Sequence, residues 1–134
     1  MSNPKLDALV SQMENYLECL KQFNHFLAIG RSKKYTAEDE NQFLEVKSVI
    51  VQELEIILAA FEGGSPSRED VHGMISAVPS LRYLCEGNEA TLRGVENQWH
   101  KIYVGFQALL GQLKVKQREV ENKGFFSSVF SKKK

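Results

Sequence analysis

The chain has 134 residues, of which 43% are apolar and 25% are charged, a balance typical of a folded globular domain and not of a disordered chain. The 17 basic and 17 acidic residues give a formal net charge of zero, which argues against a protein that binds nucleic acid over its whole surface. No run approaches the ~20 apolar residues that a membrane-spanning helix needs.

Residues 5–29 are predicted to form the first helix. Their apolar residues recur at alternating intervals of three and four, which places them on one face of a helix. Gly30 follows as the expected C-terminal stop, and the basic residues after it suit the negative end of the helix dipole. The apolar stripe consists of Leu6, Leu9, Met13, Tyr16, Leu20, Phe23 and Leu27.

A second helix is predicted from about Ala37 to Glu62. Thr36 is a good N-cap, and the acidic residues after it favour a first helical turn. The β-branched residues around 49–51 raise a strand as an alternative, but the period and the length of the segment favour a helix. Its stripe consists of Phe43, Val46, Ile50, Leu54, Ile57 and Phe61.

The third helix is predicted to be short and broken. Residues 63–66, with the sequence GGSP, end the second helix, and Ser67 with Asp70 resembles a helix-starting cap. Pro79 interrupts the helix, and residues 79–86 are predicted to restart as a second short helical piece. The inward residues are expected to be Val71, Met74, Ile75, Val78, Leu81, Leu84 and Cys85.

The fourth helix is the longest, from about Glu89 to Asn122. Its apolar stripe ends at Leu113, and Lys116 then takes a position that should be apolar. Because this helix is longer than the others, its C-terminal end should extend beyond them. The stripe consists of Leu92, Val95, Trp99, Ile102, Phe106, Leu109 and Leu113.

These elements predict an all-α fold, an antiparallel up-down-up-down four-helix bundle with a broken, short third helix and a long fourth helix. Residues 1–122 are assigned to the bundle and residues 123–134 to an aromatic and basic C-terminal tail. In this topology the N-terminus, the Gly-Gly loop and the tail share one end of the bundle. The loop with Arg31, Lys33 and Lys34 lies at the other end.

The stripes contain almost no polar residues that could form an active site. Tyr16 and Trp99 are interpreted as core residues with one satisfied polar group each. Glu69 and His72 have the spacing found in di-iron bundles, but the chain has only one such motif. No phosphate-binding loop and no nucleophile motif is present. We therefore expect a non-catalytic protein without metal or cofactor, and an enzyme or di-metal bundle is the less favoured alternative.

The two cysteines, Cys19 and Cys85, do not form a CxxC motif. The first apolar stretch is interrupted by acidic residues and does not read as a secretory signal. We interpret both cysteines as small buried side chains of a protein in the reducing cytoplasm, with a disulfide or a reactive thiol as the alternative.

The tail, residues 123–134, combines aromatic residues with lysines. Its apolar residues have the spacing i, i+1, i+4, i+5, which places them on one face of a helix. Such a helix can insert its aromatic residues at the headgroup boundary while its lysines contact anionic lipid. The candidate binding residues are Phe125, Phe126, Val129, Phe130, Lys132, Lys133 and Lys134.

The sequence KGFFSSVFSKKK resembles the C-terminal membrane-targeting tails of bacterial cell-division proteins. The resemblance covers about a dozen residues, and it implies reversible docking on the inner face of the membrane. The lysines stand after the aromatic residues here, whereas those tails carry them within the amphipathic turn. No nucleotide-binding domain precedes the tail.

Charge is unevenly distributed along the chain. Residues 114–134 contain seven Lys or Arg against two Glu, so residues 1–113 carry the opposite excess. The basic end favours an acidic partner, and we expect an anionic membrane surface there. The alternatives are a tail that folds back on the bundle, and an adaptor or chaperone-like protein whose tail binds another protein or a second copy in a homodimer. Nucleic acid is not an expected partner.

Overall fold

The computed structural model describes the backbone of residues 3–61 and 66–131, and the side chains of this part as far as Lys123. Within these ranges it has five α-helices and no strand, which confirms the all-α prediction. The helices are α1 (Pro4–Ser32), α2 (Ala37–Ala59), α3 (Arg68–Ala77), α4 (Leu81–Glu86) and α5 (Glu89–Ser131).

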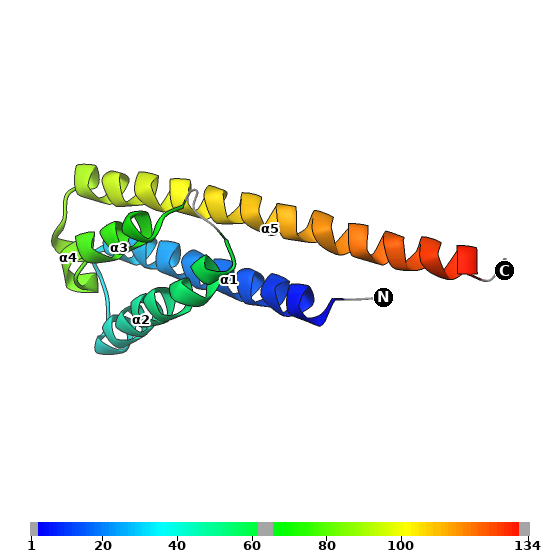
Figure 1. Ribbon diagram of the computed structural model, residues 1–134. Coiled ribbons are helices and arrows are strands. Elements are labelled where there is room, and N and C mark those ends of the chain that lie inside the picture. The colour runs from blue at the N-terminus through cyan, green and yellow to red at the C-terminus, as the bar shows by residue number, and fades with distance from the viewer. Residues whose placement is uncertain (1–2, 62–65, 132–134) are drawn as a thin grey trace.

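Helix α1 is the centre of the arrangement. It packs against α5, α2 and α4, and α3 lies between α2 and α5. In Figure 1, α1 and α5 run side by side in opposite directions, so that α1 begins and α5 ends on the same side of the molecule. The C-terminal part of α5 extends beyond all the other helices (Figure 1).

The predicted helix starts are confirmed at two capping boxes. The Thr36 hydroxyl accepts a hydrogen bond from the Asp39 backbone N–H, and the Asp39 carboxylate accepts one from Thr36 N–H. Ser67 and Asp70 form the same reciprocal pair at the start of α3. Because each box satisfies two backbone N–H groups that the helix leaves free, both starts are set by four consecutive residues.

Helix α1 does not stop at Gly30 as predicted. It continues to Ser32, and Lys33 takes the left-handed conformation (φ 61°) that caps it. Gly30 serves packing instead, because a Cβ atom at this position would lie 2.8 Å from Leu84 Cβ of α4. Glycine is therefore needed here for the close approach of two helices.

Arg31, at the end of α1, also contacts α5. Its guanidinium forms salt bridges with Glu89, at 3.2 Å, and with Glu96, at 2.6 Å, and both are residues of α5. These contacts tie the end of α1 to the first turns of α5. Sequence alone could not show this pairing, since the partners are 58 and 65 residues away.

Pro79 divides the predicted third helix into α3 and α4. The residue before it, Val78, has φ −125° and ψ 83°, which is not helical. A proline disfavours the helical conformation in the residue that precedes it. The chain then resumes a helix at Leu81, after Ser80 accepts a hydrogen bond from Tyr83 N–H as the N-cap.

Helix α5 is longer than predicted. It has 43 residues and ends at Ser131, whereas the apolar stripe predicted an end near Asn122. The apolar stripe marks only the residues that are buried against other helices. A helix can continue beyond the last buried residue when no proline interrupts it. Gly124 costs only about 1 kcal/mol relative to alanine. The boundary between bundle and tail therefore does not coincide with a helix end.

The core consists largely of the predicted stripes, and it also includes Phe26, which lay outside them. Leu20, Phe23, Phe43, Leu54 and Phe106 are fully buried, as are the inward residues Met74, Leu81 and Leu84 of the two short helices. The ends of the stripes are less buried, because Leu6, Leu9 and Leu109 only flank the core. Among the described side chains, Leu113 is the last buried residue of α5.

Candidate functional site

The two polar groups expected in the core have the satisfied hydrogen bonds that were predicted. The Tyr16 hydroxyl donates to the carbonyl oxygen of Ile50 at 2.9 Å, and Trp99 Nε1–H donates to the carbonyl of Leu20 at 2.7 Å. Both bonds join neighbouring helices. Within the part of the chain whose side chains are described, no buried polar side-chain atom is without a hydrogen-bond partner.

Tyr16 gives the fold a predicted sensitivity to alkaline pH. Burial, with smaller contributions from Cys19 and Glu53, raises the pKa of the Tyr16 phenol above its ordinary value of about 10. The folded state thus favours the neutral phenol. The resulting stability is fully present below about pH 10 and is lost as the pH rises toward the folded-state pKa, because the unfolded chain ionises first.

Replacement of Tyr16 by phenylalanine should reduce the free energy of unfolding at pH 7 by about 0.5–1.5 kcal/mol, the usual contribution of one hydrogen bond. It should also reduce the loss of stability that begins near pH 10. Urea unfolding at several pH values measures both effects. The matched control is Tyr83→Phe, at an exposed position, and equal pH profiles for the two variants would contradict the assignment.

Metal-binding residues do not gather in the described structure. Among the side chains of residues 3–61 and 66–123, no three His, Cys, Asp or Glu lie close enough to share a metal ion. Glu69 and His72 lie in the first turn and a half of α3, where Glu69 is exposed and His72 is half-buried.

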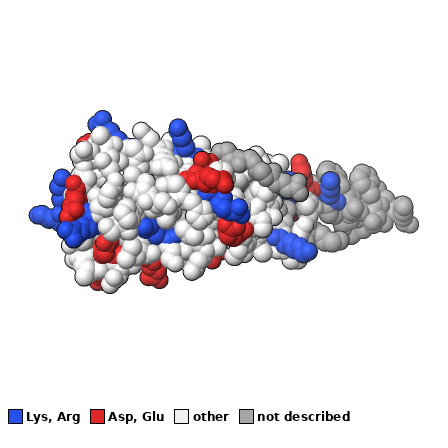
Figure 2. Space-filling view, turned by 60° about the vertical axis from the view of Figure 1, so that its left-hand side comes forward, with Lys and Arg blue, Asp and Glu red and all other residues white. Residues whose placement is uncertain are grey.

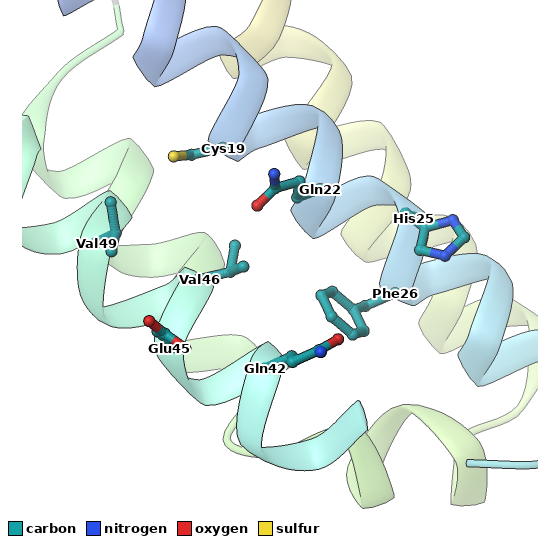
Figure 3. A pocket seen from close by; sticks show the side chains of 8 residues that line it. All are labelled: Cys19, Gln22, His25, Phe26, Gln42, Glu45, Val46 and Val49. Atoms are coloured by element: carbon teal, nitrogen blue, oxygen red, sulfur yellow. The ribbon is translucent and has the colours of Figure 1, made fainter. Parts of the chain in front are cut away.

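A cleft of about 450 Å³ lies between α1 and α2. Phe26, which is 5% exposed, forms part of its floor together with the half-buried Val46 and Val49. Polar side chains form the rims. Its lining residues are Cys19, Gln22, His25 and Phe26 of α1 and Gln42, Glu45, Val46 and Val49 of α2 (Figure 3).

A second hollow of about 180 Å³ continues this cleft toward the start of α1. It shares Cys19 and Val49 with the first hollow, and adds Gln12, Asn15, Tyr16 and Glu53. The two hollows together form one groove along the seam between α1 and α2, which we call the α1–α2 groove. The distance from Gln12 to Phe26 along α1 is about 21 Å at 1.5 Å per residue.

The thiol of Cys19 lies where the two hollows meet. Burial raises its pKa, and so do the carboxylates of Glu53 and Glu18. The thiol is therefore protonated at neutral pH and is a weak nucleophile. Cys85 is also a free thiol, and burial raises its pKa too.

Charged side chains of both signs are interspersed on the surface of the described structure. Figure 2 shows Lys and Arg beside Asp and Glu on the visible face, and both signs gather at the end that contains α4. At this end Arg31 pairs with Glu89 and Glu96, and Arg82 pairs with Glu86 at 2.8 Å. Arg31 and Arg82 at this end are thus matched by acidic neighbours.

The predicted site residues lie at the end of α5. The backbone of Phe125, Phe126, Val129 and Phe130 is helical, but their side chains are outside the described part. Lys132, Lys133 and Lys134 lie outside the described residues altogether. The structure thus joins the four apolar positions in one helix and leaves the binding prediction itself untested.

The end of α5 lies beyond the start of α1. Gln117 Nε2 of α5 donates to Asp7 Oδ1 of α1 at 2.9 Å, which fixes the register of the two antiparallel helices. From this register, about 11 residues of α5 continue past Pro4, a length of roughly 16 Å. None of the described helices is both long and apolar enough to cross a bilayer.

The groove was missed by sequence reasoning. Its rim residues, such as Gln22 and Glu45, look like ordinary exposed positions beside an apolar stripe.

Comparison with known proteins adds no family to these observations: no protein-family model, no curated protein and no solved structure matches this chain.

Proposed function

We propose that this chain is a non-catalytic helical binding or scaffold protein that attaches peripherally to an anionic membrane surface, at its cytoplasmic face. Residues 123–134 are the attachment segment. The remainder is an antiparallel four-helix bundle in which α3 and α4 together take the third position. The observation that carries the proposal is the unbroken helical backbone of α5 from the bundle core to Ser131.

The helical backbone supports the proposal through its register. Positions 125, 126, 129 and 130 fall within about two fifths of the helix circumference, because successive residues are about 100° apart. An amphipathic helix of this kind binds a membrane by placing its apolar face at the boundary between headgroups and acyl chains. The segment needs no refolding to present such a face.

The position of the segment also supports the proposal. Leu113 is the last buried residue among the described side chains of α5, and Lys114, Lys116 and Arg118 are exposed. From the register of Gln117 against Asp7, α1 begins level with about residue 120 of α5, and Phe125 lies about 7 Å further along the helix. A membrane-bound segment would therefore leave room for the bundle above the surface, with basic residues near the anionic headgroups.

Lysines should add to the attraction. Lys123 and Lys132–Lys134 bracket the apolar positions in the sequence. Each lysine close to an anionic membrane contributes about 1 kcal/mol, which corresponds to roughly fivefold in affinity, and this contribution weakens as salt is added. The proposed attachment therefore has an apolar part that tolerates salt and an electrostatic part that does not.

Co-sedimentation with lipid vesicles tests the proposal. The full chain should sediment with vesicles that contain phosphatidylglycerol and much less with vesicles of phosphatidylcholine alone. Phe126→Asp should weaken binding by about tenfold or more, since it removes an aromatic ring that would enter the membrane and adds a charge that anionic lipid repels.

The matched control is Leu44→Asp. It makes the same kind of change at an apolar residue of α2 that is 44% exposed, and it should bind vesicles as the unmodified chain does. Equal binding by the chain and by Phe126→Asp would reject membrane attachment through this segment. Retained binding in high salt combined with sensitivity to Phe126→Asp would assign most of the affinity to the apolar face.

A further inference from the structure

The α1–α2 groove is an apolar seam that no other helix covers in the described structure. Helix α1 uses its other faces to contact α4 and α5, and α2 contacts α3 and α4. The groove is thus bounded by two helices and floored by Phe26, Val46 and Val49. An amphipathic helix commonly binds in such a groove with its apolar face down.

The charge of the groove defines the kind of helix that fits. Among its lining residues are two carboxylates, Glu45 and Glu53, and no lysine or arginine. Glu18 lies close enough to add to the negative potential at Cys19. A helix with apolar residues on one face and lysines at its ends complements this groove in both respects.

The chain itself contains a segment with this chemistry. Residues 123–131 continue α5 as a helix and carry apolar residues at positions on one face, and in the sequence Lys123 precedes these apolar positions and Lys132–Lys134 follow them. The helical part of the segment spans about 12 Å, which is shorter than the groove of about 21 Å.

The segment cannot occupy the groove of its own chain. Asp7 contacts Gln117, and the groove begins five residues further along α1, at Gln12, in the direction away from the end of α5. Phe125 lies eight residues past Gln117 in the opposite direction. Along the helix axes the two are therefore separated by about 20 Å, and the continuous helix keeps them apart.

We propose that the α1–α2 groove binds the aromatic-basic segment of a second copy of this chain. The apolar positions 125, 126, 129 and 130 of one copy lie on Phe26, Val46 and Val49 of the other. The lysines of the segment face Glu45 and Glu53. Two copies that exchange segments form a closed pair, and one-way exchange produces longer assemblies.

This inference adds to the proposed function, because the same segment would bind either lipid or the groove. The two forms of binding are mutually exclusive for one segment, so vesicles should dissociate the assembly by mass action. The test of the groove uses no lipid. Its failure therefore leaves the membrane proposal intact, and failure of the vesicle experiment leaves the groove intact.

Complementation between two variants of the full chain tests the groove. Phe126→Asp has an impaired segment and an intact groove, whereas Glu45→Lys with Glu53→Lys has an impaired groove and an intact segment. Sedimentation velocity over a concentration series should show self-association of the unmodified chain and its loss in each variant alone. A mixture of the two should associate again, because one intact interface forms between them.

The matched control carries Glu14→Lys and Glu69→Lys. It has the same change of charge at two exposed residues that do not line the groove, and it should self-associate within about twofold of the unmodified chain. The affinity of self-association of the groove variant should fall by about tenfold or more, since each reversed charge pair changes the affinity by up to about fivefold. Circular dichroism checks that every variant is folded.

The reactivity of Cys19 is a second readout. Its alkylation by a thiol reagent, followed by mass spectrometry, should slow as the concentration of the unmodified chain rises, while the buried Cys85 serves as the internal reference. The groove variant should show no such concentration dependence.

Three results would overturn the proposal. The first is an unmodified chain that stays monomeric throughout the concentration series, which would show that the groove does not bind a second copy. The second is undiminished self-association of the groove variant, which would indicate contact between segments alone. The third is a mixture of the two variants that remains monomeric.

Discussion

Replacement of Phe43 by alanine should lower the free energy of unfolding by about 3–5 kcal/mol, the usual loss for a buried aromatic ring that leaves a cavity. Phe43 is fully buried in α2. Its ring centroid lies 5.7 Å from that of Phe23 and 5.3 Å from that of Phe26, and Lys47 Nζ lies 5.7 Å from its centre. The alanine variant loses all of these contacts at once.

The loss should be large because the cavity has little means to collapse. The two phenylalanines that face Phe43 belong to α1, which is also held by α4 and α5. Urea unfolding followed by circular dichroism measures the change. Leu44→Ala is the matched control, since Leu44 is the next residue and is 44% exposed. A loss at Phe43 no greater than the loss at Leu44 would show that this packing is wrong.

Phe43→Ala should also affect the groove. Phe26 contributes to the groove floor on one side and packs edge to face against Phe43 on the other. Removal of Phe43 takes away the ring that packs against Phe26 and so loosens the floor on which the segment is proposed to lie. At concentrations where the variant remains folded, its self-association should therefore be weaker than that of the unmodified chain.

Gly30→Ala should destabilise the protein by about 1–3 kcal/mol, the range expected for overpacking. The new methyl group would lie 2.8 Å from Leu84 Cβ and 3.4 Å from the Leu84 backbone carbon. Neither atom can move by a change of side-chain rotamer, so α4 must shift away from α1. In an open helix the same substitution would stabilise, because alanine favours a helix more than glycine does.

Gly111→Ala is the matched control for the sign of the stability change in Gly30→Ala. Gly111 lies within α5, and a Cβ atom there would have no neighbour within 4 Å. Its replacement should stabilise the protein by about 0.5–1 kcal/mol. Thermal and urea unfolding of both variants should therefore give changes of opposite sign. Stabilisation by Gly30→Ala comparable with that of Gly111→Ala would mean that α4 does not pack closely on α1.

The candidate site could be predicted only in part. The aromatic-basic segment is visible in sequence because its residues are consecutive, so its composition and spacing can be read directly. The extent of its helix was not predicted, since the decay of the apolar stripe after Leu113 reports the end of burial and not the end of the helix. The α1–α2 groove has no local signal. Cys19 and Val49 come from different helices, and only their packing makes them neighbours.

What the sequence determined by itself is local. The helix faces follow from apolar residues three and four apart, the starts of α2 and α3 from capping boxes, and the division between α3 and α4 from Pro79. All of these interactions join residues within one or two turns, so a single chain segment contains the whole cause. The all-α class follows from their sum.

Only the tertiary structure decided how these helices use their remaining surfaces. It assigned Gly30 to a close contact with Leu84, paired Arg31 with Glu89 and Glu96, and left the seam between α1 and α2 uncovered. These outcomes depend on the angles and registers at which helices distant in sequence meet. Many side-chain combinations satisfy the same periodic pattern, so the pattern specifies which face is buried but not which partner covers it.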